Sequence, residues 1–97
     1  MITVFHANDA IIRESFAYGY GAKMESLIAY FHQGQYDNAG DVDTDDLNVA
    51  FAQSQNIESA WGDGKQRSTS VGDILYRDNG DAFLVAINGF DQIRKGA

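Results

Sequence analysis

Short runs of β-branched and aromatic residues along the chain predict the strands of an antiparallel sheet. Residues 2–5 form the first run, and residues 74–77 and 82–87 form two more on either side of Asn79-Gly80. Asn-Gly supplies the positive φ angles of tight hairpin turns, so we expect the two later runs to pair as a hairpin. Residues 36–43 are more polar and predict an edge or connecting strand.

Between the first run and residue 36, helical spacing replaces the strand pattern. Asn8 or Asp9 can cap a short first helix, because either side chain can accept a hydrogen bond from a first-turn N–H group. A second helix is predicted over about residues 22–33, ended by Gly34. Its apolar residues stand at i, i+3, i+4 and i+7, which places them on one stripe: Met24, Leu27, Ile28 and Phe31.

A third helix is predicted after residue 44. Thr44 is the expected N-cap, with Asp45 and Asp46 in the first turn, where the helix dipole favours negative charge. Apolar residues of the helix follow at Leu47, Ala50 and Phe51. From Asp91 onward the sequence predicts a short polar tail.

Together these elements predict one α+β domain over residues 1–97. We expect a three- or four-stranded antiparallel sheet with two to three helices packed on one face.

The amino-acid composition excludes several classes of functional site and partner. The 97 residues include no cysteine, which excludes disulfides, thiolate nucleophiles and cysteine-ligated metals. The runs of apolar residues are too short for a membrane span, and we expect no signal peptide. Fourteen acidic residues against seven basic ones give a net charge of −7, which argues against direct binding to nucleic acid.

The negative charge is concentrated in one segment. No Lys or Arg occurs between Lys23 and Lys65, and residues 37–63 carry seven acidic side chains. Carboxylates crowded without counter-charges repel one another, so this segment either binds a basic partner or is spread over a solvated surface. The predicted partner-binding residues are these seven acids and two tyrosines that flank Gly19 in an expected exposed turn: Asp37, Asp41, Asp43, Asp45, Asp46, Glu58, Asp63, Tyr18 and Tyr20. The two tyrosines could equally serve simple packing.

The spacing of Asp41, Asp43 and Asp45 allows two interpretations besides a solvated strand end that leads into a capped helix. It matches the start of an EF-hand loop, but that loop needs glycine at its sixth position and glutamate at its twelfth, where this chain has Asp46 and Ala52. We therefore expect no calcium site. If the segment is extended, the three carboxylates project at intervals of roughly 6.6 Å, as a row of phosphate-like charges.

Catalytic motifs are weak in this sequence. His6 with Asp9 could bind a metal or form an acid–base pair, and His32 is the second histidine. The serines lack the G-x-S-x-G pattern, and a domain of this size has little room for a deep substrate cleft. The sequence therefore favours a protein that is not an enzyme and that needs no cofactor or metal, with a small histidine-dependent enzyme as a third hypothesis.

The second half of the chain resembles small acidic proteins encoded by phages, prophages and plasmids. Residues 67–90 carry the similar signature, Arg-Ser-Thr-Ser-Val-Gly-Asp-Ile-Leu-Tyr followed by Ala-Phe-Leu-Val-Ala-Ile-Asn-Gly-Phe. Residues 43–51 resemble the helix that precedes this signature, and residues 2–6 resemble the opening strand. Ser70, Gly72 and Asp73 also have a structural interpretation, because they can turn the chain into the hairpin.

The resemblance implies a protein of a mobile element that acts in the cytoplasm of a bacterial host. Some acidic proteins of such elements, among them anti-CRISPR proteins, present carboxylates where DNA phosphates would lie. We therefore expect a stoichiometric inhibitor that binds the basic DNA-binding surface of a host nucleoprotein complex, with a CRISPR surveillance complex as the suspected partner. The alternative is a non-enzymatic phage or plasmid interaction module whose acidic segment only serves solubility.

Overall fold

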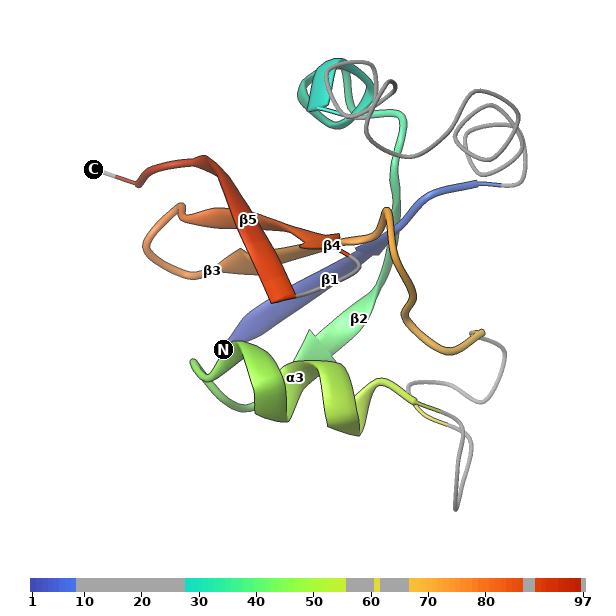
Figure 1. Ribbon diagram of the computed structural model, residues 1–97, viewed down its shortest axis with the longest axis vertical. Helices are drawn as coiled ribbons and strands as arrows, with labels where there is room; N and C mark the ends of the chain where they lie inside the picture. Colours follow the sequence, from blue (N-terminus) through green and yellow to red (C-terminus); the bar gives the residue numbers. More distant parts are fainter. Residues whose placement is uncertain (9–27, 56–60, 62–66, 87–88, 97) are drawn as a thin grey trace.

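The computed structural model describes residues 1–8, 28–55, 61, 67–86 and 89–96, which form a five-stranded antiparallel sheet with two helical segments (Figure 1). The strands are β1 (Ile2–His6), β2 (Asp37–Val42), β3 (Ile74–Arg77), β4 (Ala82–Ala86) and β5 (Gly89–Arg94), in the spatial order β2-β1-β3-β4-β5. The helical segments are α3 (Leu47–Gln53) and residues 28–32. The predicted α+β class is confirmed.

The fifth strand corrects the predicted count of three or four. β5 occupies most of the segment expected to be a polar tail, and it pairs with β4 from Ala86↔Gly89 to Ala82↔Arg94. Only Phe90 and Ile93 of this strand are half-buried, and its other residues are exposed. An edge strand that buries so little has almost no apolar alternation, so its sequence does not predict a strand.

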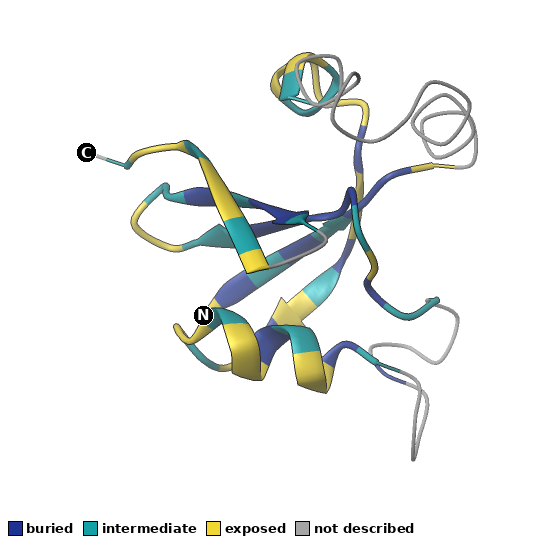
Figure 2. Cartoon of the chain, viewed as in Figure 1, coloured by how far each residue is buried: buried dark blue, intermediate teal, exposed yellow. Residues whose placement is uncertain are grey.

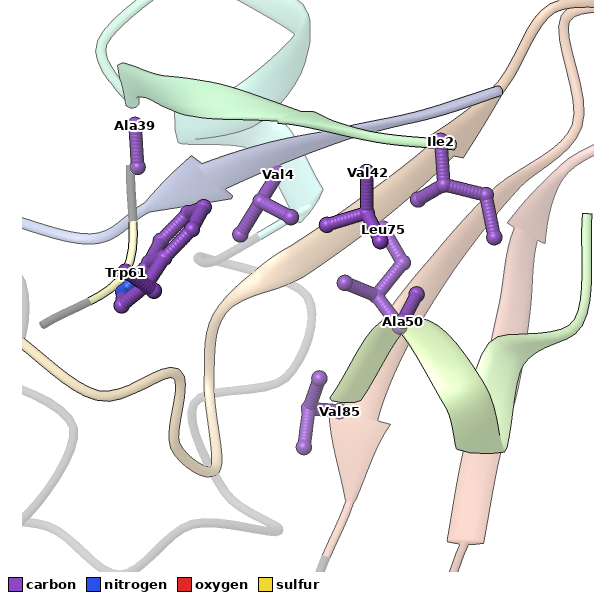
Figure 3. Close-up of a cluster of buried hydrophobic side chains, with 8 residues drawn as sticks. All are labelled: Ile2, Val4, Ala39, Val42, Ala50, Trp61, Leu75 and Val85. Carbon is purple, nitrogen blue, oxygen red and sulfur yellow. The ribbon is translucent and has the colours of Figure 1, made fainter. Parts of the chain in front are cut away.

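Two hydrophobic cores cover the two faces of the sheet. The first core contains Ile2, Val4, Ala39, Val42, Ala50, Trp61, Leu75 and Val85 (Figure 3). The second core contains Ala7, Tyr36, Ile74, Ala82 and Leu84. Because neighbouring residues of a strand point to opposite faces, Leu75 and Ile74 of β3 assign these cores to opposite faces of the sheet.

The helical segments lie on opposite faces, so the prediction that the helices share one face is wrong. Leu47 and Phe51 of α3 pack against the first core, whereas Tyr30 and Phe31 pack against the second. Figure 2 shows that buried positions are concentrated along the central strands, whereas many positions of β5 and α3 are exposed. Each helix carries one apolar stripe, and nothing in a stripe specifies which face of a sheet it will cover.

Asp46, and not Thr44, is the N-cap of α3. The Asp46 carboxylate accepts hydrogen bonds from the backbone N–H groups of Asn48 (2.9 Å) and Val49 (3.2 Å). Thr44 instead accepts a hydrogen bond from the Asp46 N–H at 3.1 Å, which fixes the turn before the cap. The helix therefore begins later than predicted, and neither Asp45 nor Asp46 lies in its first turn.

The β3–β4 hairpin is confirmed, but its turn differs from the predicted one. The Arg77 N–H donates to the Asp81 carbonyl (2.8 Å), and the Gly80 N–H donates to the Arg77 carbonyl (3.0 Å). Gly80 has a φ of 97°, whereas Asn79 does not adopt a positive φ. Glycine alone therefore supplies the left-handed residue of this three-residue loop.

Gly34 ends the helical residues 28–32 as predicted. Its φ is 74°, and its N–H donates to the Phe31 carbonyl at 3.0 Å. The predicted helix after Asn8 and the start of the second helix lie outside the described residues.

Removing the cap of α3 tests its assignment. We expect Asp46→Ala to lower the free energy of unfolding by about 1 kcal/mol, because two first-turn N–H groups lose their acceptor. Asp43→Ala removes the same charge from an exposed side chain that caps nothing, and we expect a change within about 0.5 kcal/mol. Urea denaturation of both variants measures the difference, and equal effects would contradict the assignment.

Candidate functional site

Five exposed aspartates follow one edge of the sheet and the connection from β2 to α3. We call this set the acidic edge: Asp37, Asp41, Asp43, Asp45 and Asp46. β2 is an outermost strand, and its aspartates Asp37 and Asp41 are exposed. The other predicted partner-binding residues, Glu58, Asp63, Tyr18 and Tyr20, lie outside the described residues.

A bulge in β2 divides the acidic edge between the two faces of the sheet. Val4 pairs with Gly40 and Phe5 pairs with Asn38, which leaves Ala39 as an extra residue. Asp37 consequently stands opposite His6, on the face of the first core, and Asp41 stands opposite Thr3, on the other face.

The predicted row of evenly spaced carboxylates is wrong. Thr3 Oγ1 donates to Asp41 Oδ1 at 2.7 Å, which fixes Asp41 across the strand pair. β2 then ends at Val42, and Asp43 and Asp45 belong to the connection to α3. The period of two that would align three alternate residues therefore does not apply beyond Asp41.

The N-terminal ammonium lies within the acidic edge. It donates to Asp45 Oδ1 at 2.9 Å and to Asp78 Oδ2 at 3.1 Å, which joins the β2–α3 connection to the β3–β4 turn. These hydrogen bonds raise the pKa of the α-amine, and the bond from the ammonium holds the pKa of Asp45 below its usual value. Asp78 is an acidic neighbour that charge counting along the sequence did not identify, because only β1–β3 pairing brings it close.

Arg77 is the side-chain cation that lies beside the acidic edge in the described part of the chain. Its Nε donates to the Asp45 carbonyl at 3.1 Å, and its guanidinium stacks 4.9 Å from the centre of the Phe83 ring. Its Nη1 lies 3.9 Å from the Asp81 carboxylate. Among the salt bridges between described residues, none reaches Asp37, Asp41, Asp43 or Asp46.

An open groove of about 480 Å³ runs past the start of α3. Six residues line it: Asp45, Asp46, Leu47, Asn48, Arg77 and Phe90. Carboxylates and a guanidinium thus share one depression, so the acidic edge is not uniformly negative at this point.

An ion pair with a buried carboxylate lies near the opposite end of β1 from this groove. The Asp73 carboxylate is fully buried and accepts hydrogen bonds from both terminal nitrogens of Arg67, at 2.6 and 2.7 Å. It also accepts the Ser70 N–H at 2.8 Å and the Ala7 N–H at 2.9 Å. The carboxylate is therefore fully hydrogen-bonded, as a buried charge must be.

This ion pair explains the signature Arg-Ser-Thr-Ser-Val-Gly-Asp in structural terms. The Asp73 N–H donates back to the Ser70 carbonyl at 3.1 Å, and Gly72 adopts a φ of 97°. The Gly72 N–H donates to the Val85 carbonyl (2.9 Å), and the Val85 N–H donates to the Asp73 carbonyl (2.8 Å), so the turn is joined to β4. The predicted role of Ser70, Gly72 and Asp73 in turning the chain is confirmed.

His6 is a buried member of the same network. Its Nε2 shares a hydrogen bond of 3.0 Å with Thr69 Oγ1 and lies 3.9 Å from Asp73 Oδ2. Burial lowers the pKa of His6, and the nearby Arg67 lowers it further, while Asp73 and Asp37 act in the opposite direction.

His32 is exposed on the helical segment of the other face, so the two histidines do not form one site. Asp9, the proposed partner of His6, lies outside the described residues. Within the described ranges, no group of three or more His, Asp or Glu side chains could hold a metal ion.

Comparison of the chain with protein-family models, curated proteins and solved structures gave no match. In the part of the chain that the structure describes, no helix has the length and apolar character needed to cross a membrane.

The burial of His6 predicts a loss of stability in mild acid. Because burial lowers the folded-state pKa of His6, its titration leaves the free energy of unfolding unchanged above the ordinary histidine pKa of about 6.5 and reduces it as the pH falls from there toward the lowered folded-state pKa. We expect His6→Gln to reduce this pH dependence between about pH 7 and about pH 5. Thermal unfolding across the range measures it, with exposed His32→Gln as the control that should retain the parent's dependence.

Breaking the buried ion pair should be much more costly than neutralising an exposed aspartate. We expect Asp73→Asn to lower the free energy of unfolding by about 3 kcal/mol, because Arg67 and two N–H groups lose a charged acceptor. Asp91→Asn, at an exposed position of β5, should change it by less than about 0.5 kcal/mol. A small effect of Asp73→Asn in urea denaturation would show that the pair is not a main support of this fold.

Proposed function

We propose that this chain is a stoichiometric protein inhibitor of a DNA-targeting nucleoprotein complex and that it binds the complex through the acidic edge. The supporting observation is that four of the five carboxylates of this edge are exposed and have no salt-bridge partner among the described residues. Carboxylates crowded without counter-charges repel one another and lower stability, so a binding role for them is consistent with their retention.

The physical basis is competition for a basic groove. Protein surfaces that bind DNA are lined with Lys and Arg and gain much of their affinity by neutralising phosphates. Carboxylates held on an ordered strand and a capped turn can occupy such a groove without the cost of ordering a flexible chain. Long-range attraction to a chain of charge −7 would also speed the encounter.

The second half of the chain resembles small acidic proteins of phages, prophages and plasmids. This resemblance leads us to propose that the chain belongs to a phage or other mobile element and acts in the cytoplasm of the bacterial host. The first partner to test is a CRISPR surveillance complex, where the chain would block the capture of target DNA. In this proposal the chain is an anti-CRISPR protein and DNA mimic that catalyses no reaction.

One observation favours the alternative of an interaction module whose acidic segment serves only solubility and local structure. Asp46 caps α3, Asp45 binds the N-terminal ammonium, and Asp41 accepts the Thr3 hydroxyl. Three of the five carboxylates thus have a local role. Asp43 has no such role in the described part of the chain, so a substitution of Asp43 distinguishes the inhibitor from the interaction module.

Reversing one charge tests the proposed function. We expect Asp43→Lys to raise the Kd for a purified surveillance complex by about tenfold or more, which corresponds to about 1.4 kcal/mol. Asp91→Lys changes the net charge equally on the opposite edge strand, and it should raise the Kd by less than about threefold. Titration of DNA capture against each variant provides the measurement.

Salt dependence supplies a second readout of the same interaction. The Kd of the parent chain should rise at least about tenfold between about 50 and about 200 mM salt.

Equal effects of Asp43→Lys and Asp91→Lys on the Kd would contradict binding through the acidic edge. Capture of a capsid or replication protein from the host, with no effect on DNA capture, would instead support the interaction module.

A further inference from the structure

We infer that Trp61 and the Arg67–Asp73 ion pair form a lock on the bulge of β2, and that this lock determines the face of the sheet on which Asp37 is presented. Trp61, Arg67 and Asp73 are thus positioning residues for the acidic edge. The inferred lock is a property of the fold, and its consequence for binding rests on the proposed function.

The bulge leaves a space that Trp61 fills. Gly40 has a φ of 141°, and a Cβ atom added to it would lie 3.3 Å from Trp61 Cζ3 and 3.8 Å from Cη2. The indole therefore packs directly on the backbone of Gly40. Figure 3 shows its ring beside Ala39, the extra residue of the bulge, and Val4, the residue that the bulge faces. Only glycine combines this φ with so close an approach.

The ion pair in turn holds Trp61 in place. The indole Nε1 donates to the Arg67 carbonyl at 2.7 Å, and the Arg67 side chain is fixed by two hydrogen bonds to Asp73. Asp73 also accepts the Ala7 N–H, and Arg67 donates to the Ala7 carbonyl at 2.9 Å. The end of β1 is thus connected to Trp61 through one set of hydrogen bonds, and Trp61 packs on the bulge of β2.

β2 needs such a lock because it is an edge strand. It pairs with β1 alone, so no second neighbour fixes its register. Without the bulge, Asp37 would stand opposite Ala7 instead of His6 and would move to the face that carries Asp41. A shift by one residue would therefore rearrange the negative charge without changing the sequence.

Two variants and one control test the lock by NMR. We expect Trp61→Leu and Gly40→Ala each to abolish the cross-strand contacts of the pairs Phe5–Asn38 and His6–Asp37. Gly34→Ala is the control, because Gly34 also has a positive φ but no atom lies within 4 Å of an added Cβ. This variant should retain both pairs.

Native contacts for both pairs in either folded lock variant would overturn the inference. Global unfolding of both lock variants, with Gly34→Ala folded, would also overturn it, because Trp61 would then support the whole core and not one register.

Binding to a purified CRISPR surveillance complex separates the inferred lock from the proposed function. We expect the Kd of a register-shifted Trp61→Leu or Gly40→Ala to rise by about threefold or more, since Asp37 has moved. If the variants shift their register but the parent chain does not bind the complex, the proposed function is contradicted and the inferred lock is supported. If the lock variants keep the parent's register and Kd while Asp43→Lys still binds the complex weakly, the inferred lock is contradicted and the proposed function is not.

Discussion

The buried Asp73 carboxylate is the constraint on which much of this structure depends. An unpaired charge at a fully buried position would cost several kcal/mol, so its four hydrogen-bond donors must be held in place together. Those donors come from the end of β1 and from the loop before β3. Satisfying one carboxylate therefore joins residues 66 positions apart in sequence and orders a loop that has no regular secondary structure.

Both edge strands of the sheet combine charge with a bulge. β2 has its extra residue at Ala39, and β5 has one at Ile93, between the pairs Ala82↔Arg94 and Phe83↔Gln92. Bulges and charged side chains discourage a further strand from pairing with an edge. The exposed edges therefore favour recognition by side-chain charge over recognition by backbone hydrogen bonds, which agrees with an interaction through carboxylates.

The acidic residues show how a structural role and the proposed binding role can belong to the same side chains. Asp46 stabilises α3, and Asp45 and Asp78 hold the N-terminal ammonium, yet all three carboxylates remain exposed to a partner. A local hydrogen bond orders a carboxylate without removing its charge. Such preorganisation lowers the entropy lost on binding, so local roles and a binding role are compatible.

Local signals in the sequence are sufficient to predict four features: the first strand, the β3–β4 hairpin, the end of a helix at Gly34 and the edge position of β2. It also located the acidic segment, since charge is read directly from composition. Tertiary structure alone decided that the helices cover opposite faces, that residues 89–94 form a strand, and that Asp37 and Asp41 face apart. The last outcome depends on one extra residue at Ala39, in a bulge whose Gly40 lies against Trp61, and no local sequence pattern records a contact between segments so far apart.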